Sequence, residues 1–318
     1  VKAIEERHTV NGGRATCIVI ENDGLFTLAP GVGTEHDDTS MSGPQILDAI
    51  KAAGIVGLGG AGFPTPVKLA PRNPEQIDYV IANGSECEPY ITCDDQLMRT
   101  RSDGIVEGMR LILRLFPNAK GVIAIEDNKP EAIAAMTKAC ASDSNISVLE
   151  VKAKYPEGGE RNLIGVVTGR QLRFGQLPAD LGCVVCNVSS LNAIYRAVCK
   201  SEPLMTRLFT VSGDAVVKPH TMEVRIGTSC RELLEAAGGI KPECTAKKIL
   251  CGGPMMGIAM STLDVPIAKN NNALTVLAED EVELAENQMT ACLRCGRCGH
   301  VCPIGLVPQM MAEAAERK

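Results

Sequence analysis

The sequence predicts an α/β chain in which a Rossmann-like domain with a parallel sheet precedes a β-grasp domain and a helical, cysteine-bearing segment. Between about residues 43 and 200, helical and strand-like segments alternate, which is typical of a parallel sheet covered by helices on both faces. After Pro203 the order becomes strand, strand, helix, strand, which is the order of a β-grasp module. From Glu279 onward the pattern is helical and includes four closely spaced cysteines.

Each element is expected from its apolar spacing and its flanking turn residues. The alternating region is expected to contain a helix over 43–53, a strand over 77–82, a helix through 109–113, a strand over 121–125, a helix begun by Asn128 with Pro130 in its first turn, and a strand over 147–151. The later region is expected to contain strands over 208–212 and 222–226, a helix over 230–237 and a strand over 248–251. We therefore expect four parts: the end of a small β domain at 1–28, the α/β domain at 29–203, the β-grasp domain at 204–270 and the cysteine-bearing domain at 271–318.

Composition narrows the class of protein. The chain has 318 residues, 45% of them hydrophobic, with a net charge of −6 and 3% aromatic residues. An acidic chain without a basic run and with few stacking side chains argues against nucleic acid as a partner. No apolar run is long enough to span a bilayer, so any membrane association would be peripheral. The sequence opens without Met inside strand-like residues and stops within a helix-like run, so we expect a fragment.

The most specific motif is a cysteine run near the end of the chain. Its four cysteines have the spacing C-x2-C-x2-C-x3-C-P and are Cys292, Cys295, Cys298 and Cys302. This spacing is an iron–sulfur signature, in which the fourth cysteine serves a second cluster in two-cluster ferredoxins. A zinc site or a disulfide pair is the alternative, but zinc sites usually need a second Cys/His doublet across a spacer. The run therefore predicts 4Fe-4S clusters and electron transfer.

The other cysteines favour packing over chemistry. Fourteen cysteines in a chain with a full apolar core are not a disulfide scaffold, and a reducing compartment fits better. Cys183 and Cys186 have redox-motif spacing, but they lie in a strand-like run, so we expect them to be core residues. The same holds for single cysteines in apolar contexts, which are Cys17, Cys140, Cys199, Cys230, Cys244 and Cys251.

A glycine-rich loop at 57–65 (GLGGAGFPT) precedes a short helical segment. Glycines let the backbone approach an anion closely, and free N–H groups at a helix start attract phosphate. Glycines also simply make tight turns. The loop is neither a Walker A motif, which needs Gly-Lys-Ser/Thr, nor a dinucleotide G-x-G-x-x-G motif followed by an acidic ribose ligand at the usual distance. A mononucleotide phosphate is the ligand that it favours.

Two further loops follow predicted strands. The first, at 83–89 (NGSECEP), is followed closely by Asp94 and Asp95, and the second, at 155–161 (YPEGGER), precedes a helix. Because ligands of open α/β sheets bind beyond the carboxyl ends of the strands, the loop at 83–89 and the glycine loop would face one crevice. Asn83 would suit a flavin or its ribityl hydroxyls, and the carboxylates would suit a nicotinamide amide or a ribose. A solvated acidic loop is the alternative.

In combination, these motifs resemble the RnfC family, the C subunit of membrane-associated ferredoxin:NAD oxidoreductase (Rnf) complexes. The segments that carry the resemblance are 57–65, 83–89, 155–160, 186–188 and the cysteine run. The first four are also similar to the flavin-binding subunit of NADH:quinone oxidoreductase (complex I). The resemblance implies an α/β domain that binds FMN and NAD(H), a β-grasp domain of the soluble-ligand-binding type, a ferredoxin-like domain with two 4Fe-4S clusters, and a barrel-sandwich domain that ends within 1–28.

The resemblance also implies roles for particular residues. The phosphate of FMN or the pyrophosphate of NADH would be held by Gly57, Gly59, Gly60, Gly62 and Lys68, and the flavin by Asn83 and Asn187. The nicotinamide side would be lined by Glu86, Glu88, Asp94, Glu157 and Glu160, with Glu86 and Glu157 as the candidate catalytic residues. Phe63 would stack on adenine, and Tyr155, Gly158 and Gly159 would complete the cofactor site. Cys292, Cys295 and Cys298 would bind one cluster and Cys302 the other.

This chain departs from the complex I pattern at three places. Leu58 stands where an arginine is usual, Cys87 interrupts the acidic loop, and Ala70-Pro71 replaces a second aromatic residue. Of the roles that the resemblance implies, adenine binding is the one that these three differences affect most.

The function that follows is hydride transfer between NAD(H) and FMN, coupled to one-electron transfer through iron–sulfur clusters. The expected partners are other subunits of a membrane electron-transport complex and, indirectly, a ferredoxin-like carrier. The expected location is peripheral, on the cytoplasmic face of the membrane. Two alternatives are an RnfC-like cobalamin reductase of a microcompartment and an electron-wire subunit that keeps the fold without binding a nucleotide.

Overall fold

The computed structural model describes residues 1–246, 248–278, 290–302 and 305–317. They belong to two units, Val1–Ala278 and Glu279–Lys318, and each unit is described by itself.

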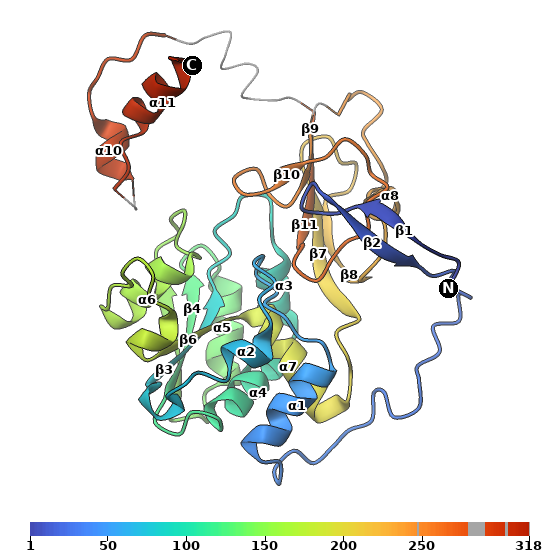
Figure 1. The fold of residues 1–318 in the computed structure, drawn as a ribbon, viewed down its shortest axis with the longest axis vertical. Coiled ribbons are helices and arrows are strands. Elements are labelled where there is room, and N and C mark those ends of the chain that lie inside the picture. Colours follow the sequence, from blue (N-terminus) through green and yellow to red (C-terminus); the bar gives the residue numbers. More distant parts are fainter. Residues whose placement is uncertain (247, 279–289, 303–304, 318) are drawn as a thin grey trace. The chain divides into compact units, whose positions relative to one another are not determined.

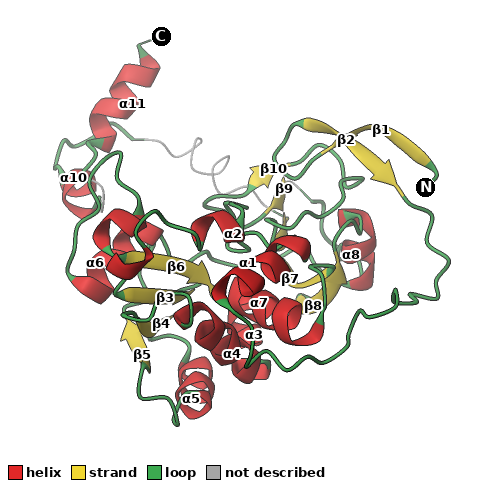
Figure 2. Cartoon of the chain, turned by 60° about the horizontal axis from the view of Figure 1, so that its bottom comes forward, coloured by secondary structure: helices red, strands yellow, loops and turns green. Residues whose placement is uncertain are grey.

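A four-stranded parallel sheet is the centre of the first unit (Figures 1 and 2). Its strand order is β5-β4-β3-β6, and the strands are β3 (Tyr79–Gly84), β4 (Lys120–Glu126), β5 (Ile146–Val151) and β6 (Cys183–Asn187). All neighbours pair in parallel, with Asn83 opposite Asn187. The register therefore brings the two asparagines together at the carboxyl ends of the two adjacent strands.

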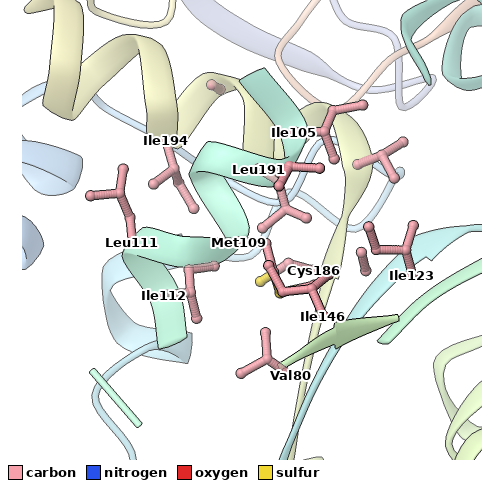
Figure 3. Close-up of a cluster of buried hydrophobic side chains, with 14 of the residues drawn as sticks. Val80, Ile105, Met109, Leu111, Ile112, Ile123, Ile146, Cys186, Leu191 and Ile194 are labelled. Carbon is pink, nitrogen blue, oxygen red and sulfur yellow. The ribbon is translucent and has the colours of Figure 1, made fainter. Parts of the chain in front are cut away.

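The sheet is buried on both faces, as its continuous apolar strands predict. On one face, Val80, Ile123 and Cys186 pack against helices, in a cluster with Met109 and Leu191 that Figure 3 shows. The opposite face belongs to a second cluster, made of Ile81, Ala124, Val151, Leu163, Ile164, Cys183 and Val185. Cys183 and Cys186 are buried free thiols on opposite faces, which confirms that they are packing residues.

Helices cover both faces of the sheet. They are α1 (Gly43–Ala52), α3 (Cys93–Thr100), α4 (Ser102–Leu113), α5 (Pro130–Ala139), α6 (Glu160–Thr168) and α7 (Val188–Lys200), with the short helix α2 (Thr65–Lys68) and the 3-10 turns η1 (Pro74–Gln76) and η2 (Pro178–Leu181). Helix α3 is not among the elements expected from sequence, because its first turn carries Asp94 and Asp95 and so resembles an acidic loop. Acidic residues are favourable there because they face the positive end of the helix dipole.

The β-grasp domain has a mixed five-stranded sheet of order β10-β9-β11-β7-β8. Its elements are β7 (Thr206–Ser212), β8 (His220–Arg225), α8 (Cys230–Ala236), β9 (Lys248–Cys251), β10 (Ile258–Ala259) and β11 (Ala273–Leu277). Strand β11 lies between β7, to which it is parallel, and β9, to which it is antiparallel. The sheet thus extends past the boundary expected at residue 270, and the first unit ends at Ala278. Sequence reasoning misses the buried run that forms β11 because its partners are distant in sequence.

The chain begins with an antiparallel hairpin of β1 (Ala3–His8) and β2 (Arg14–Val19). Val10, in its turn, packs into the β-grasp core. Within the described residues, no helix combines the length and the apolar character needed to cross a lipid bilayer.

The second unit contains the short helices α10 (Arg297–Val301) and α11 (Pro308–Glu316). Residues 290–296 are not helical, and 279–289 lie outside the described residues, so the helical pattern expected from Glu279 is correct only for part of this segment. The local reason is visible at Arg294 and Gly296, which have φ values of 55° and 72° and turn the chain between cysteines.

Helices α4 and α7 cross at a glycine contact that generates a stability prediction. A Cβ atom on Gly108 would overlap the carbonyl of Leu191, whereas a Cβ on Gly165 in α6 would meet only the Arg170 carbonyl oxygen, at 3.6 Å. We expect Gly108→Ala to lower the free energy of unfolding by about 2–3 kcal/mol because the helices must separate. Gly165→Ala, the matched control, should be neutral or stabilising by about 0.5–1 kcal/mol. Denaturant unfolding of both variants tests this, and equal effects would contradict the packing argument.

Candidate functional site

An open cleft of about 590 Å³ lies at the carboxyl ends of β3 and β6. One wall comes from the α/β domain, and ten of the residues singled out in the sequence line it: Gly59, Gly60, Asn83, Glu86, Glu88, Asp94, Tyr155, Gly158, Gly159 and Asn187. The other wall comes from the β-grasp domain and the turn of the N-terminal hairpin. Three loops that are far apart in sequence therefore meet where the parallel sheet predicts a ligand.

The glycine loop is a closed turn. The Gly57 N–H donates to Phe63 O at 2.8 Å, and the Gly62 N–H donates to Gly57 O at 3.2 Å. Gly60 and Gly62 have φ values of 120° and 67°, which disfavour other residues. Ser190 Oγ accepts the Leu58 N–H at 2.9 Å and so fixes the loop to α7.

The loop after β3 is fixed to the loop after β5. Asn83 Nδ2 donates to Gly158 O at 2.8 Å, and Asn83 Oδ1 accepts the Ser85 N–H at 3.0 Å. Gly158 lies so close to Ser85 that a Cβ would overlap the Ser85 carbonyl oxygen. Ser85 is a buried residue of the cleft lining, and its Oγ has no hydrogen-bond partner among the described residues. A buried hydroxyl without a partner is a ready point of contact for a ligand.

Glu86 and Asp94 form a buried carboxyl pair at the base of the cleft. Glu86 Oε1 accepts the Asp94 N–H at 2.9 Å and Glu86 Oε2 accepts the Asp95 N–H at 3.1 Å, so Glu86 caps α3. Burial, reinforced by the charge of Asp94, raises the pKa of Glu86 to about 7. Burial also raises the pKa of Asp94, although hydrogen bonds from Ser189 and Asn187 oppose that rise.

Asp94 holds the asparagine at the end of β6. Its Oδ2 accepts from Asn187 Nδ2 at 2.7 Å and its Oδ1 from Ser189 Oγ at 2.7 Å. Asn187 Oδ1 accepts the Ser189 N–H at 2.9 Å and thereby caps α7. Asp94 thus orients Asn187 toward the cleft, and both its carboxylate oxygens are engaged.

Several expected site residues lie away from the cleft lining. Lys68 Nζ donates to Glu160 Oε2 at 3.0 Å and to Val185 O at 2.9 Å. Phe63 is half exposed. Gly57 and Gly62 take part in the hydrogen bonds that close the glycine loop. Lys68 and Glu160 together tie α2 to the start of α6.

Glu157 belongs to a separate acidic group beside the cleft. Glu157 and Glu126 each have a buried carboxyl oxygen without a partner among the described residues, and burial raises the pKa of both. Lys129 Nζ lies 3.6 Å from Glu126 Oε2 and donates to the Glu86 carbonyl oxygen at 3.3 Å. Through Lys129, this group is therefore bonded to the backbone of the loop after β3.

The four cysteines of the second unit are free thiols. Cys292 and Cys295 are exposed, whereas Cys298 and Cys302 are partly buried. The Arg294 N–H approaches Cys292 Sγ at 3.4 Å, and the Leu306 N–H approaches Cys302 Sγ at 3.3 Å. Backbone N–H groups aimed at thiol sulfurs are the environment that iron–sulfur clusters use.

Comparison with known proteins places this geometry in a family. Residues 50–196 match the family described as the Nuo51 FMN-binding domain, and residues 208–259 match the SLBB domain. The chain is 40% identical over 317 residues to the C subunit of the Na⁺-translocating ferredoxin:NAD⁺ oxidoreductase complex of Acetobacterium woodii, covering all of this chain and 71% of that one. The chain belongs to the RnfC family.

Other RnfC-family relatives agree over most of the chain. The C subunit of the proton-translocating ferredoxin:NAD⁺ oxidoreductase complex of Clostridium ljungdahlii is 43% identical, with 94% of this chain and 65% of that one covered. The C subunit of an ion-translocating oxidoreductase complex of Pseudomonas aeruginosa is 42% identical, with 95% and 38% covered. The chain thus spans from about two fifths to about seven tenths of the length of these relatives.

A solved structure supports the fold of this RnfC-family chain. A chain of an NAD⁺-reducing [NiFe]-hydrogenase in the H₂-reduced state superposes with a TM-score of 0.62 at 24% identity, covering 74% of this chain and 47% of that one. Its air-oxidised state gives the same TM-score at 23% identity.

Sequence reasoning missed the wall that the β-grasp domain contributes to the cleft. It consists of Cys251, Gly252, Gly253, Met256, Gly257, Ile258, Asn270, Asn271 and Asn272, with Val10 and Asn11 from the hairpin turn. The available signals were the run of three asparagines and the glycine pair that follows β9. Both segments lie outside the α/β domain in sequence, so the sequence alone does not connect them with its loops.

The raised pKa of Glu86 predicts how stability depends on pH in this RnfC-family chain. The carboxyl ionises near 4.5 when unfolded and near 7 when folded, so between these values the folded state keeps a proton that the unfolded state has lost. Stability should therefore fall as pH rises through this window, by about 3 kcal/mol in total. Glu86→Gln should flatten that fall, as measured by melting temperatures between pH 5 and 8. The exposed control Glu235→Gln should keep the wild-type slope, and the same slope in Glu86→Gln would refute the assignment.

Proposed function

We propose that the chain is the NAD(H)- and FMN-binding, electron-input or electron-output part of an ion-translocating ferredoxin:NAD⁺ oxidoreductase. The observation that carries the proposal is the cleft at the carboxyl ends of β3 and β6, where the glycine loop and the two acidic loops meet. The names of the relatives supply the two substrates, ferredoxin and NAD⁺.

The residues present fit a flavin mononucleotide. The glycine loop offers backbone without side chains, and Gly59 approaches the Asn187 side chain so closely that a Cβ would lie 3.2 Å from it. Leu58, where complex I has an arginine, is buried in the core while its N–H and carbonyl hold the loop. The substitution therefore leaves the glycine loop intact, which argues against a subunit that only conducts electrons.

The residues of the α/β wall have separate roles in the proposal. Gly59 and Gly60 would lie against the FMN phosphate, and Asn83, Asn187 and Ser85 Oγ would contact the flavin and its ribityl chain. When bound, FMN accepts a hydride from NADH and passes electrons on singly, which allows NAD(H) to exchange electrons with iron–sulfur clusters. The protein would hold the two molecules in position and exclude water. The carboxyl pair of Glu86 and Asp94 would form the floor of the cleft.

The second unit would hold the clusters. Thiolates of Cys292, Cys295 and Cys298 would bind one 4Fe-4S cluster, and Cys302 the other, as their spacing predicts. The partners would be the other subunits of the complex, with a ferredoxin-like carrier reached through them. We place the chain peripherally at the cytoplasmic face of the membrane.

Flavin binding is tested with anaerobically purified chain. Visible absorption and extracted flavin should show one FMN, which NADH bleaches. Asn83→Ala should weaken FMN binding by about tenfold or more, because one contact to the flavin and the bond to Gly158 are lost together. Asn118→Ala, which removes an exposed amide that bonds the Glu75 carbonyl oxygen, is the matched control. A soluble, folded chain with a cluster spectrum and no flavin would refute the proposal.

Cluster binding is tested by iron and sulfide analysis. Cys295→Ser should lower the iron content and the absorbance near 400 nm, because serine is a poorer ligand for iron than a thiolate. Cys244→Ser, which alters a single cysteine of the β-grasp domain, should leave both unchanged. Equal iron in the wild type and in the Cys295→Ser variant would contradict the assignment.

A further inference from the structure

A buried arginine of the β-grasp domain bonds the glycine loop. Arg207 on β7 is only 4% exposed. Its Nη2 donates to the Leu58 carbonyl oxygen at 3.1 Å, and its Nη1 donates to the Lys269 carbonyl oxygen. One guanidinium therefore joins the glycine loop to the segment that precedes the three asparagines.

The charge of Arg207 also faces the carboxyl pair. A buried guanidinium needs an opposite charge nearby, and among the described residues the Asp94 carboxylate supplies it, whereas burial raises the pKa of the neighbouring Cys93 thiol and keeps that thiol neutral. Asp94 in turn holds Asn187 and Ser189. Arg207 thus bonds the glycine loop through Leu58, and its charge favours the ionised form of Asp94.

A second contact joins the domains at the other side of the cleft. Glu88 Oε1 accepts the Met255 N–H at 2.7 Å and the Met256 N–H at 3.0 Å, across the turn that follows β9. Gly253 leaves room for this carboxylate, because a Cβ there would overlap the Glu88 side chain. One oxygen of Glu88 is therefore engaged by the β-grasp turn.

We propose that the β-grasp domain is a structural half of the nucleotide site. Arg207 is the positioning residue of the glycine loop, and the contact between Glu88 and the turn at 253–256 fixes the wall against which the dinucleotide lies. FMN affinity then depends on Arg207, and NADH affinity depends on the turn. This inference rests on the proposed function, because it assigns positions within the same cleft.

The first experiment tests Arg207 in the whole chain by fluorescence titration with FMN. Arg207→Lys keeps a positive charge near Asp94 but loses the fork that spans two carbonyls, so the Kd for FMN should rise about tenfold or more. Arg231→Lys removes a comparable fork that binds Asp264 within the β-grasp domain and should leave the Kd unchanged. An Arg207→Lys variant that melts earlier but binds FMN like the wild type would show a merely structural role and overturn the proposal.

The second experiment tests the turn by steady-state dye reduction at saturating FMN. Gly253→Ala displaces Glu88 from the turn without altering its charge, so the KM for NADH should rise about fivefold or more while kcat and FMN content stay unchanged. Gly165→Ala is the control, because its Cβ has room. An unchanged KM in Gly253→Ala would overturn the role of the turn.

The double variant Glu88→Ala, Gly253→Ala tests whether the substitution at Gly253 acts through Glu88. If Glu88 acts through the turn, the double variant should have the KM of Glu88→Ala alone. Full additivity would show that Gly253→Ala raises the KM independently of Glu88 and would overturn the proposal. Wild-type protein without FMN would overturn the proposed function as well, whereas wild-type FMN content with unaffected variants would overturn this inference alone.

Discussion

The hydrogen bonds of the buried Asp94 carboxylate are the interaction on which the arrangement of the site depends. Asp94 lies in the first turn of α3, receives hydrogen bonds from Asn187 and Ser189 at the start of α7, and sits beside Glu86 from the loop after β3. A carboxylate in this position is stabilised by the N-termini of two helices and by their capping groups. Without it, the Asn187 side chain at the end of β6 would lose the acceptor that fixes it next to Asn83.

The second carboxyl of the pair, Glu86, makes this arrangement unfavourable for the stability of the folded protein. Two ionised carboxylates at this depth would repel, so burial raises the pKa of Glu86 to about 7 and leaves Asp94 as the partner of the Arg207 charge. The chain places this unfavourable carboxyl pair at the base of the cleft and not in its apolar core. That placement is typical of functional sites, where groups that stability alone would remove are retained.

Much of the fold can be predicted from sequence because its signals are local. The buried strands β3, β4 and β6 are short apolar runs, and helix α5 carries Pro130 at its first turn. The loops of the cleft can also be found, since Asn83 and Gly158 belong to loops that follow strands. What cannot be predicted depends on distant partners: β11 is defined by its pairing with β7 and β9, and α3 is hidden by the acidic residues that its N-terminus favours.

The same distinction, between local sequence signals and contacts with distant partners, applies to the residues of the site. Sequence motifs identify residues by type, but they do not say which atoms are already engaged inside the protein. Glu88 and Lys68 are acidic and basic side chains near a nucleotide cleft, yet one binds the turn of another domain and the other bonds Glu160 and the Val185 carbonyl oxygen. Asn83 and Asn187 bond backbone and neighbouring side chains and also line the cleft. A cleft between two domains needs residues that contact the ligand and also residues that bond other parts of the protein. The second kind fixes the loops that position the flavin and the dinucleotide.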